Sequence, residues 1–496
     1  MRYNAPPMNL RVLGILLLLA LGLRIAAAIN TKVINHDGAR FTMSARAMVA
    51  GDYNHALNVE PRMPPLYPLL IAKMSWLTGD LGLAGVVISV LCGTLLVIPI
   101  YLLACFMFDG RIGFFAGLIV AILPDLALNA GDVWTEPLFL LCFFSCVAAI
   151  WFAGIFPSLK LHAIAGFFGG LAVNTRPEGL YTLAAILGWG AIVLWIHRRE
   201  PERRVLRISG PLLAAAIWIA LILPYSAWIH SQFGFWSPTA NQFAVKMLGK
   251  PNVERSYTEG YRFDESKLTE SGRDQSALGR VGGQLWYVLK IYLRTSAYVF
   301  LPLLVVGFFF VRGRGALFLI LIGVGYAIPT WLGLFAGLPF DDRFALASFV
   351  ALAPVIAVGL DRLLKRMPET WPQARIATAV TVLLVLGCAV RPCLPRDQRR
   401  LTLKDAGLWI KQKYGPGKRI LTMDRRVEHY ADAWSERVPP NCRDVQGDVV
   451  VIYDPYVDRH EPGFEEKLGE RYEKVHTVPA GKRGYEVRIY ARQGVR

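Results

Sequence analysis

Repeated apolar stretches predict a polytopic α-helical membrane protein that ends in a small α/β domain. Of the 496 residues, 54% are hydrophobic and only 18% are charged, whereas about a quarter of the residues of a soluble protein carry charge. The apolar stretches repeatedly reach the roughly 20 residues that a helix needs to cross a bilayer. The net charge of +17 is explained by Lys and Arg retained in cytoplasmic loops, so we expect no nucleic-acid partner.

About eleven transmembrane helices are expected from the positions of these stretches. The first stretch could also be a signal peptide ending at Ala26-Ala27-Ala28, but its length and the position of Arg24 favour a spanning helix. The stretches lie near residues 10–29, 81–107, 113–131, 136–156, 161–175, 179–196, 211–230, 285–311, 315–337, 344–363 and 375–391.

The charges of the connecting loops predict the orientation. With the N-terminus inside, the cytoplasmic connections are short and basic, as in HRREPERRVLR at 197–207 and RGR at 312–314. Short loops rich in Lys and Arg stay in the cytoplasm. We therefore expect a multi-pass protein of the plasma (bacterial inner) membrane, with long outer loops at about 30–80 and 231–284.

The chain is predicted to divide into a transmembrane domain at 1–394 and an outward-facing α/β domain at 395–496. In the second part, helical spacing at 403–414 is followed by strand-like segments at 419–423, 448–454, 472–478 and 485–491. No Gly-rich fingerprint accompanies them, so no nucleotide site is expected. The mixed-charge run at 251–280 predicts a mobile loop.

The seven cysteines predict no zinc site, because none of their spacings matches one. Most lie within apolar spans, where a thiol usually packs as a small apolar group. Cys393 and Cys442 both fall on the outer, oxidising side, where they either form a disulfide or stay free.

Asp37 follows the first span and places a carboxylate at the membrane surface. It is either a turn aspartate beside Gly38 or a functional acid. Downstream, the helical spacing of Phe41, Ala45, Met48 and Val49 predicts an amphipathic helix lying along the membrane.

A second outer corner, PDLALNAGDVWTEP, carries Asp125, Asp132 and Glu136. Glu136 precedes Pro137 at the start of a helix, where an acid also stabilises the helix dipole. If acids from two outer corners converge, one of them can act as a general base toward a hydroxyl.

Two further corners contribute arginines. Arg176 and Glu178 lie in the turn NTRPEG, where charges this close to lipid must be paired or used. Arg343 follows Asp341-Asp342 at the outer start of another span. It can hold a phosphate with two hydrogen bonds, or it can reach out of the bilayer to the headgroups.

The order of these motifs resembles the GT-C glycosyltransferases, in the branch of the protein O-mannosyltransferases and aminoarabinose lipid A transferases. The resemblance covers roughly residues 10–360. It is carried by Leu23-Arg24 before Asp37, GDY…PPLYPLL at 51–70, TEPLFLL at 135–141, GGLA before TRPEG at 169–179, and Arg343-Phe344 before Ala353-Pro354.

The resemblance implies a sugar transfer from a polyprenyl-phosphate donor to the hydroxyl of a lipid, glycan or protein acceptor. It implies Asp37 as the catalytic base, Glu136 as the second acid, and Arg343 near the donor phosphate. Arg62 occupies a position where relatives often carry a basic residue. Many relatives have an acidic pair where this chain has Asp37-Gly38, so a divalent metal stays an open question. The alternative function is a transporter or lipid flippase without chemistry.

Overall fold

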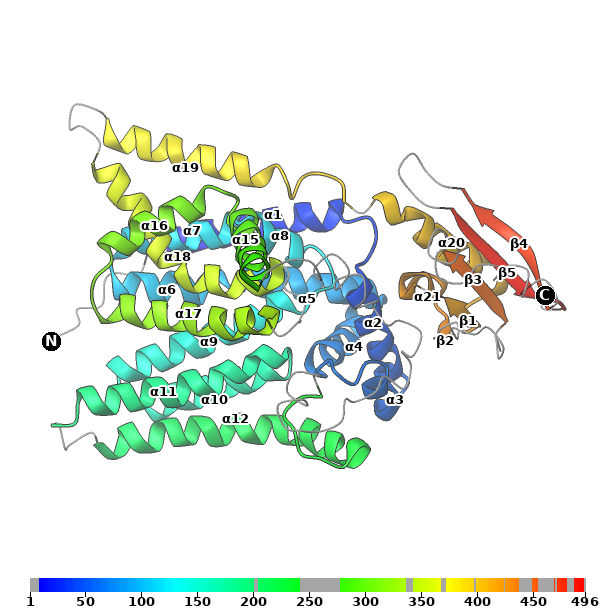
Figure 1. Cartoon of the computed structure of the whole chain (residues 1–496), viewed down its shortest axis with the longest axis horizontal. Coiled ribbons are helices and arrows are strands. Elements are labelled where there is room, and N and C mark those ends of the chain that lie inside the picture. The colour runs from blue at the N-terminus through cyan, green and yellow to red at the C-terminus, as the bar shows by residue number, and fades with distance from the viewer. Residues whose placement is uncertain are drawn as a thin grey trace.

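A bundle of helices is followed by a small sheet at one of its ends (Figure 1). The computed structural model describes residues 9–199, 204–240, 277–335, 342–366, 372–396, 398–422, 424–436, 448–453, 468, 471–479 and 486–494. The helices of the bundle and its outer loop are α1 (Leu10–Asn30), α2 (His36–Val49), α3 (Tyr53–Asn58), α4 (Leu66–Thr78), α5 (Leu81–Leu95), α6 (Val97–Met107), α7 (Gly110–Ile122), α8 (Pro124–Ala130), α9 (Glu136–Ile155), α10 (Leu159–Val173), η1 (Pro177–Leu180), α11 (Tyr181–Ile196), α12 (Arg204–Phe233), α15 (Ala277–Thr295), α16 (Phe300–Phe310), α17 (Arg314–Phe335), α18 (Asp342–Lys365) and α19 (Gln373–Ala389).

The chain is a multi-pass helical membrane protein. Within the described residues, six helices are long and apolar enough to cross a membrane, or up to eight if two bent pairs each count as one span. Three shorter apolar helices, Leu159–Val173, Arg314–Ile328 and Gln373–Ala389, lie at further predicted positions. Each predicted stretch thus contains a helix, while the total of eleven spans stays a prediction.

The third predicted span is bent rather than straight. Helices α7 and α8 meet at an angle of 53° at Pro124. Proline has no N–H and disfavours helical backbone in the preceding residue, so the carbonyls of Val120 and Ala121 lose their usual partners. The buried guanidinium of Arg24 donates to both, at 3.2 and 3.0 Å. Arg24 therefore completes the kink instead of ending the first span.

The eighth predicted span, 285–311, is also broken. Helices α15 and α16 meet at 98°, and Figure 1 shows α15 nearly end-on while its neighbours run across the view. Ala297 and Tyr298 have φ angles of 49° and 64°. Left-handed backbone in two successive residues stops a right-handed helix. The apolar composition alone could not reveal this break.

Helix α2 packs against protein on two sides instead of lying only on the membrane. It contacts α4 and α5 on one side and α21 (Arg425–Ala431) on another. Phe41, Ala45 and Met48 are buried, whereas Val49 is exposed. The predicted apolar face therefore packs on protein for most of its length, and the position of the helix along the membrane stays a prediction.

The C-terminal unit is a five-stranded mixed sheet with helices beside it. Its strand order is β2-β1-β3-β5-β4; β1 is parallel to β2 and β3, whereas β5 is antiparallel to β3 and β4. Leu403, Ile410 and Val427 form its core with Ile420 and Ile489. The elements of this unit are η3 (Gln398–Arg400), α20 (Leu401–Tyr414), β1 (Arg419–Thr422), α21, β2 (Trp434–Glu436), β3 (Val449–Tyr453), β4 (Tyr472–Val478) and β5 (Val487–Arg492).

Two predictions lie outside the described residues. The loop predicted at 251–280 falls almost entirely there, and so does Cys442 of the Cys393–Cys442 pair.

Helices α10 and α12 pack so closely that Gly166 has no room for a side chain. An added Cβ would lie 2.3 Å from the carbonyl oxygen of Ala214. Gly188 in α11 has nothing within 4 Å of such a Cβ. We expect Gly166→Ala to destabilise the protein by about 1–3 kcal/mol through overpacking.

Gly188→Ala is the matched control, and we expect it to be neutral or slightly stabilising because Ala favours helix. Thermal unfolding of both variants in detergent tests this pair. Equal melting temperatures for the two would contradict the close packing.

Candidate active site

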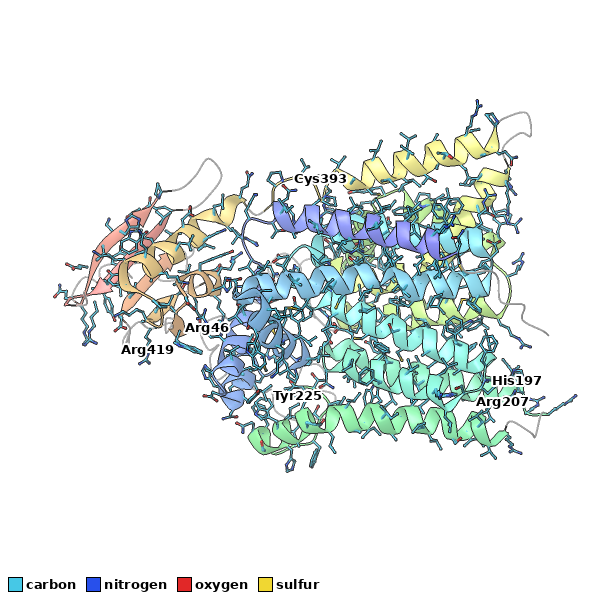
Figure 2. All side chains as sticks on the ribbon, turned by 180° about the vertical axis from the view of Figure 1, so that it is seen from behind. Arg46, His197, Arg207, Tyr225, Cys393 and Arg419 are labelled. Carbon is cyan, nitrogen blue, oxygen red and sulfur yellow. The ribbon has the colours of Figure 1, made fainter. Side chains whose placement is uncertain are left out.

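Five of the residues predicted from the sequence meet at one end of the helix bundle. Figure 2 shows His197 and Arg207 at one end of the bundle, and Arg46 of α2 and Arg419 of the C-terminal unit beyond the opposite end. The five residues are Asp37, Glu136, Arg176, Glu178 and Arg343, and they come from the starts of α2, α9 and α18 and the turn at η1.

The start of α2 is fixed by its capping residue. The side chain of Asn35 accepts the N–H of Gly38 at 2.7 Å and donates to the carbonyl of Val133 at 2.8 Å. A Cβ on Gly38 would lie 2.9 Å from Val133. Glycine therefore lets the Asp37 turn approach the second outer corner, and this is a structural reason for the Asp37-Gly38 pair.

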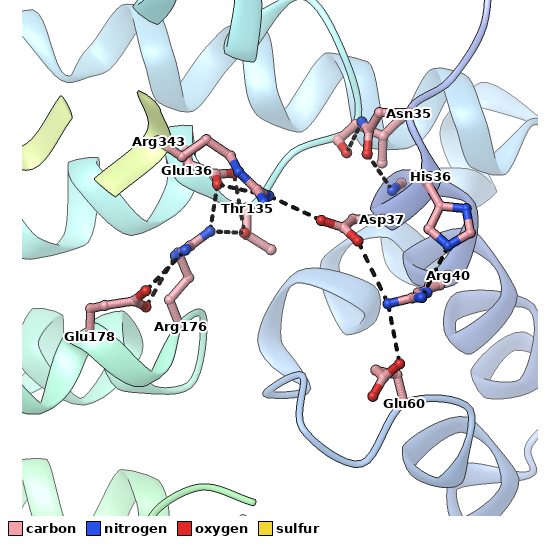
Figure 3. Close-up of polar contacts among 12 residues, drawn as sticks. Asn35, His36, Asp37, Arg40, Glu60, Thr135, Glu136, Arg176, Glu178 and Arg343 are labelled. Atoms are coloured by element: carbon pink, nitrogen blue, oxygen red, sulfur yellow. Dashed lines mark hydrogen bonds and ion pairs between the residues drawn. The ribbon is translucent and has the colours of Figure 1, made fainter. Parts of the chain in front are cut away.

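Arg343 joins two of the acids (Figure 3). Its Nη1 donates to Asp37 Oδ2 at 3.0 Å and lies 3.6 Å from Glu136 Oε1. The guanidinium also lies 4.5 Å from the ring centroid of Trp134. The side chains of Asp37 and Arg343 are about a quarter exposed, at 24% and 25%. They are therefore the accessible part of the cluster, because Glu136 is only 3% exposed.

Arg176 lies behind this contact. Its Nη1 donates to Glu136 Oε1 at 2.5 Å, and Nη2 donates to Glu178 Oε1 at 3.0 Å. The predicted alternative, pairing between Arg176 and Glu178, is therefore observed, together with a second partner from another corner. The two carboxylates, Glu136 and Glu178, keep the buried guanidinium of Arg176 charged and fixed in position.

The other side of Asp37 carries contacts that were not predicted from the sequence. Arg40 Nη1 lies 3.7 Å from Asp37 Oδ1 and 3.3 Å from Glu60 Oε2. His36 Nε2 lies 3.0 Å from Arg40 Nη2, and His36 Nδ1 lies 3.9 Å from Asp424 in the C-terminal unit. The spacing of Asp37 and Arg40, three residues apart in a helix, indicated their contact. Nothing in the sequence indicated Glu60 or Asp424 as partners.

These cations determine the protonation of Asp37. Burial alone would raise the pKa of its carboxyl, but Arg343 and Arg40, with the hydrogen bond from Arg343, favour the charged form more strongly. The pKa of Asp37 therefore lies below its ordinary value, and the group is ionised at neutral pH.

The remaining predicted residues have other surroundings. Asp132 is buried, and its Oδ1 accepts the backbone N–H groups of Val133 at 2.7 Å and Asn35 at 3.4 Å. Burial raises the pKa of Asp132 to about 6. It supports the corner that holds Asn35 rather than facing the cluster. Arg62 lies in the turn before α4, two residues after Glu60, and Asp125 pairs with Arg391.

The acids do not form a recognisable metal site. Among the described residues, no group of three or more His, Cys, Asp and Glu side chains could hold a metal ion. Asp37 and Glu136 instead face arginines. We therefore derive no step through a metal.

Residues 62–228 match the family model of dolichyl-phosphate-mannose-protein mannosyltransferases. This part of the chain is similar to the GT-C glycosyltransferases of that family. This similarity favours sugar transfer over the transporter alternative.

Solved structures share the fold of this chain. The crystal structure of ArnT from Cupriavidus metallidurans bound to undecaprenyl phosphate matches with a TM-score of 0.64 at 13% identity, over 96% of this chain and 97% of that chain. Its apo form matches with a TM-score of 0.63 at the same identity and coverage. An oligosaccharyltransferase from Archaeoglobus fulgidus, tethered to an acceptor peptide, matches with a TM-score of 0.51 at 14% identity, over 96% of this chain and 73% of that chain. No curated protein matches by sequence.

Removing Arg176 should destabilise the protein. Arg176→Gln leaves Glu136 and Glu178 close together without their shared cation, and breaking a buried pair in this way costs about 3–5 kcal/mol. Glu178→Gln is the matched control, because it leaves Arg176 paired with Glu136. We expect a larger fall in melting temperature for Arg176→Gln, and equal melting temperatures would contradict a shared cation.

Proposed function

We propose that this chain transfers a sugar from a polyprenyl-phosphate donor to an acceptor hydroxyl, with inversion and with Asp37 as the general base. The contact of Arg343 with both Asp37 and Glu136 is the observation that carries this proposal. It places a cation suited to a phosphate beside an ionised, partly exposed carboxylate. The similar proteins also support a polyprenyl-phosphate donor. The matching family is named for dolichyl-phosphate-mannose, and the structure of ArnT contains undecaprenyl phosphate.

The reaction needs a base, an electrophilic carbon and a stabilised leaving group. Asp37 takes the proton of the acceptor hydroxyl as its oxygen attacks the anomeric carbon. The bond from that carbon to the phosphate oxygen breaks, and its electron pair leaves with the polyprenyl phosphate. Arg343 stabilises the charge of this leaving group, and we assign Arg62 a supporting contact with the same phosphate.

Donor binding changes the surroundings of the base. Without donor, Asp37 is the nearer of the two anions that neutralise Arg343. A donor phosphate competes for the same guanidinium, and Asp37 then loses part of the interaction that lowers its pKa. Asp37 becomes a stronger base when the phosphate is in place. Glu136 remains held by Arg176 at 2.5 Å and keeps Arg343 near the site.

The proposed orientation places this cluster outside the cytoplasm. The basic connection ending at Arg207 lies at the far end of the bundle from Arg46 and Arg419 (Figure 2). The positive-inside rule assigns that basic end to the cytoplasm. The cluster and the C-terminal unit then face outward from the plasma membrane, while a polyprenyl tail stays in the bilayer.

Replacing the base should abolish transfer without unfolding the protein. Asp37→Asn keeps the shape of the side chain but cannot accept a proton, so we expect the turnover of undecaprenyl-phosphate mannose to fall by about 10²–10⁴-fold. Glu486→Gln is the matched control, since Glu486 also pairs with an arginine, Arg488, but lies beside β5 in the C-terminal unit. Near-normal turnover in Asp37→Asn would contradict the role of Asp37 as the general base.

The pH profile tests the pairing of Asp37 with Arg40. Arg40 favours the ionised carboxylate, so the acid limb of kcat/KM should lie below the ordinary Asp pKa of 3.8. Arg40→Gln removes a cation, raises the pKa of Asp37 and moves the acid limb to higher pH. Arg111→Gln, which removes a partner of Asp361 at the other end of the bundle, should leave the limb in place. If the acid limb does not move in Arg40→Gln, Arg40 does not lower the pKa of Asp37.

A further inference from the structure

A cleft of about 470 Å³ lies between the outer loop and the C-terminal unit. We propose that it binds the far end of an elongated, anionic carbohydrate acceptor while a hydroxyl at the near end reaches Asp37. This inference rests on the proposed function, and it names the chemistry of the acceptor. Its lining includes Met43, Ala47 and His55 from the loop, and Arg419, Arg425 and Trp434 from the C-terminal unit.

Trp434 gives this cleft an aromatic wall. The guanidinium of Arg46 lies 5.8 Å from the ring centroid of Trp434, and His55 meets the ring edge-on at 5.4 Å. The side chain is thereby held between two parts of the chain and remains partly exposed. A large flat ring with apolar faces and a polar edge suits the C–H face of a sugar, and two-angle side chains lose little entropy on binding.

The charges of the cleft favour an anion. Arg419 and Arg425 line it, and Arg419 is exposed. Asp52 is the one acid among the residues that line it, and its Oδ1 already accepts the N–H of His55 at 2.9 Å as the cap of α3. Guanidinium groups bind carboxylate and phosphate with paired hydrogen bonds. The cleft therefore suits a sugar that carries one of these groups.

One face of α2 leads from the cleft to Arg40, the cation beside the proposed base. His36, Arg40, Met43 and Ala47 follow helical spacing, and they therefore lie along one side of the helix. Met43 and Ala47 line the cleft, while Arg40 lies 3.7 Å from Asp37. With a rise of 1.5 Å per residue, Met43 lies roughly 9 Å along the axis from Asp37. A ligand that fills the cleft and reaches Asp37 must be longer than a single sugar ring.

The donor approaches from the other side. Arg343, Glu136 and Arg176 lie where α2 meets the helix bundle, and a polyprenyl tail comes from the bilayer on that side. The cleft is instead walled by the C-terminal unit, beyond the ends of the spans (Figure 2). Its occupant is the acceptor and needs no lipid tail at this point.

Binding of defined oligosaccharides to the full chain in nanodiscs tests the inference by calorimetry. Trigalacturonate offers carboxylates, singly phosphorylated maltotriose offers a phosphate, and maltotriose is the uncharged counterpart of equal length. We expect at least one anionic trimer to bind about tenfold or more tightly than maltotriose and than monomeric galacturonate. Which anionic trimer binds better identifies the anionic group.

Variants of the cleft locate the binding. Arg419→Gln and Trp434→Ala should each weaken binding of the anionic trimer by about tenfold or more. Arg419→Lys and Trp434→Phe should each retain part of the binding that is lost. Arg488→Gln on β5, where Arg488 pairs with Glu486, is the matched control and should bind as the wild type does. Melting temperatures of all variants control for folding.

Two outcomes overturn the inference: no anionic trimer binds more tightly than maltotriose, or the cleft variants bind it as the wild type does. Undecaprenyl phosphate binding is measured on the same samples. A wild-type protein that fails to bind it, or a fully active Asp37→Asn variant, counts against the proposed function itself. Loss of trimer binding with retained undecaprenyl phosphate binding supports the acceptor cleft.

Discussion

Arg343 holds two carboxylates that are distant in the sequence at one guanidinium group. Asp37 begins α2 and Glu136 begins α9, and Arg343 contacts them at 3.0 and 3.6 Å. All three lie near the edge of the membrane, where an unpaired charge would cost several kcal/mol. The starts of three helices are therefore interdependent. A shift of any one of them leaves a partly buried charge without its partner.

The C-terminal unit holds the same helix from its other side. Tyr430 accepts the backbone N–H of Ile34 at 2.8 Å, and Arg46 reaches Asp432 at 2.8 Å. His429 lies 3.0 Å from the hydroxyl of Thr42. Burial lowers the pKa of His429 to about 4, so the imidazole is neutral there near pH 7. Asp37 thus depends on the bundle for its charge partner and on the C-terminal unit for the position of its helix.

The sequence was informative where one physical property dominated. Hydropathy located the apolar helices, and period-two patterning located Tyr472–Val478 with its observed bounds. The same hydropathy could not show the breaks at Pro124 and at Ala297-Tyr298, because a kinked helix and a straight one can have equal composition. Glu60 and Asp424 joined the site only through tertiary contacts with Arg40 and His36. Such partners have no local pattern from which to predict them.

Arg24 and Arg343 show how location gives one residue type two roles. Arg24 is fully buried, and its guanidinium donates to the carbonyls of Ala20, Val120 and Ala121. Backbone carbonyls freed by a proline kink need donors in a water-free interior. Arg24 supplies these donors, so its role is structural. Arg343 is a quarter exposed and pairs with carboxylates, one of which is itself accessible. An incoming phosphate can replace a carboxylate at such an arginine, whereas nothing can replace the carbonyls around Arg24 without opening the bundle. The proposed chemistry therefore lies at the ends of the spans, where charge partners can be exchanged.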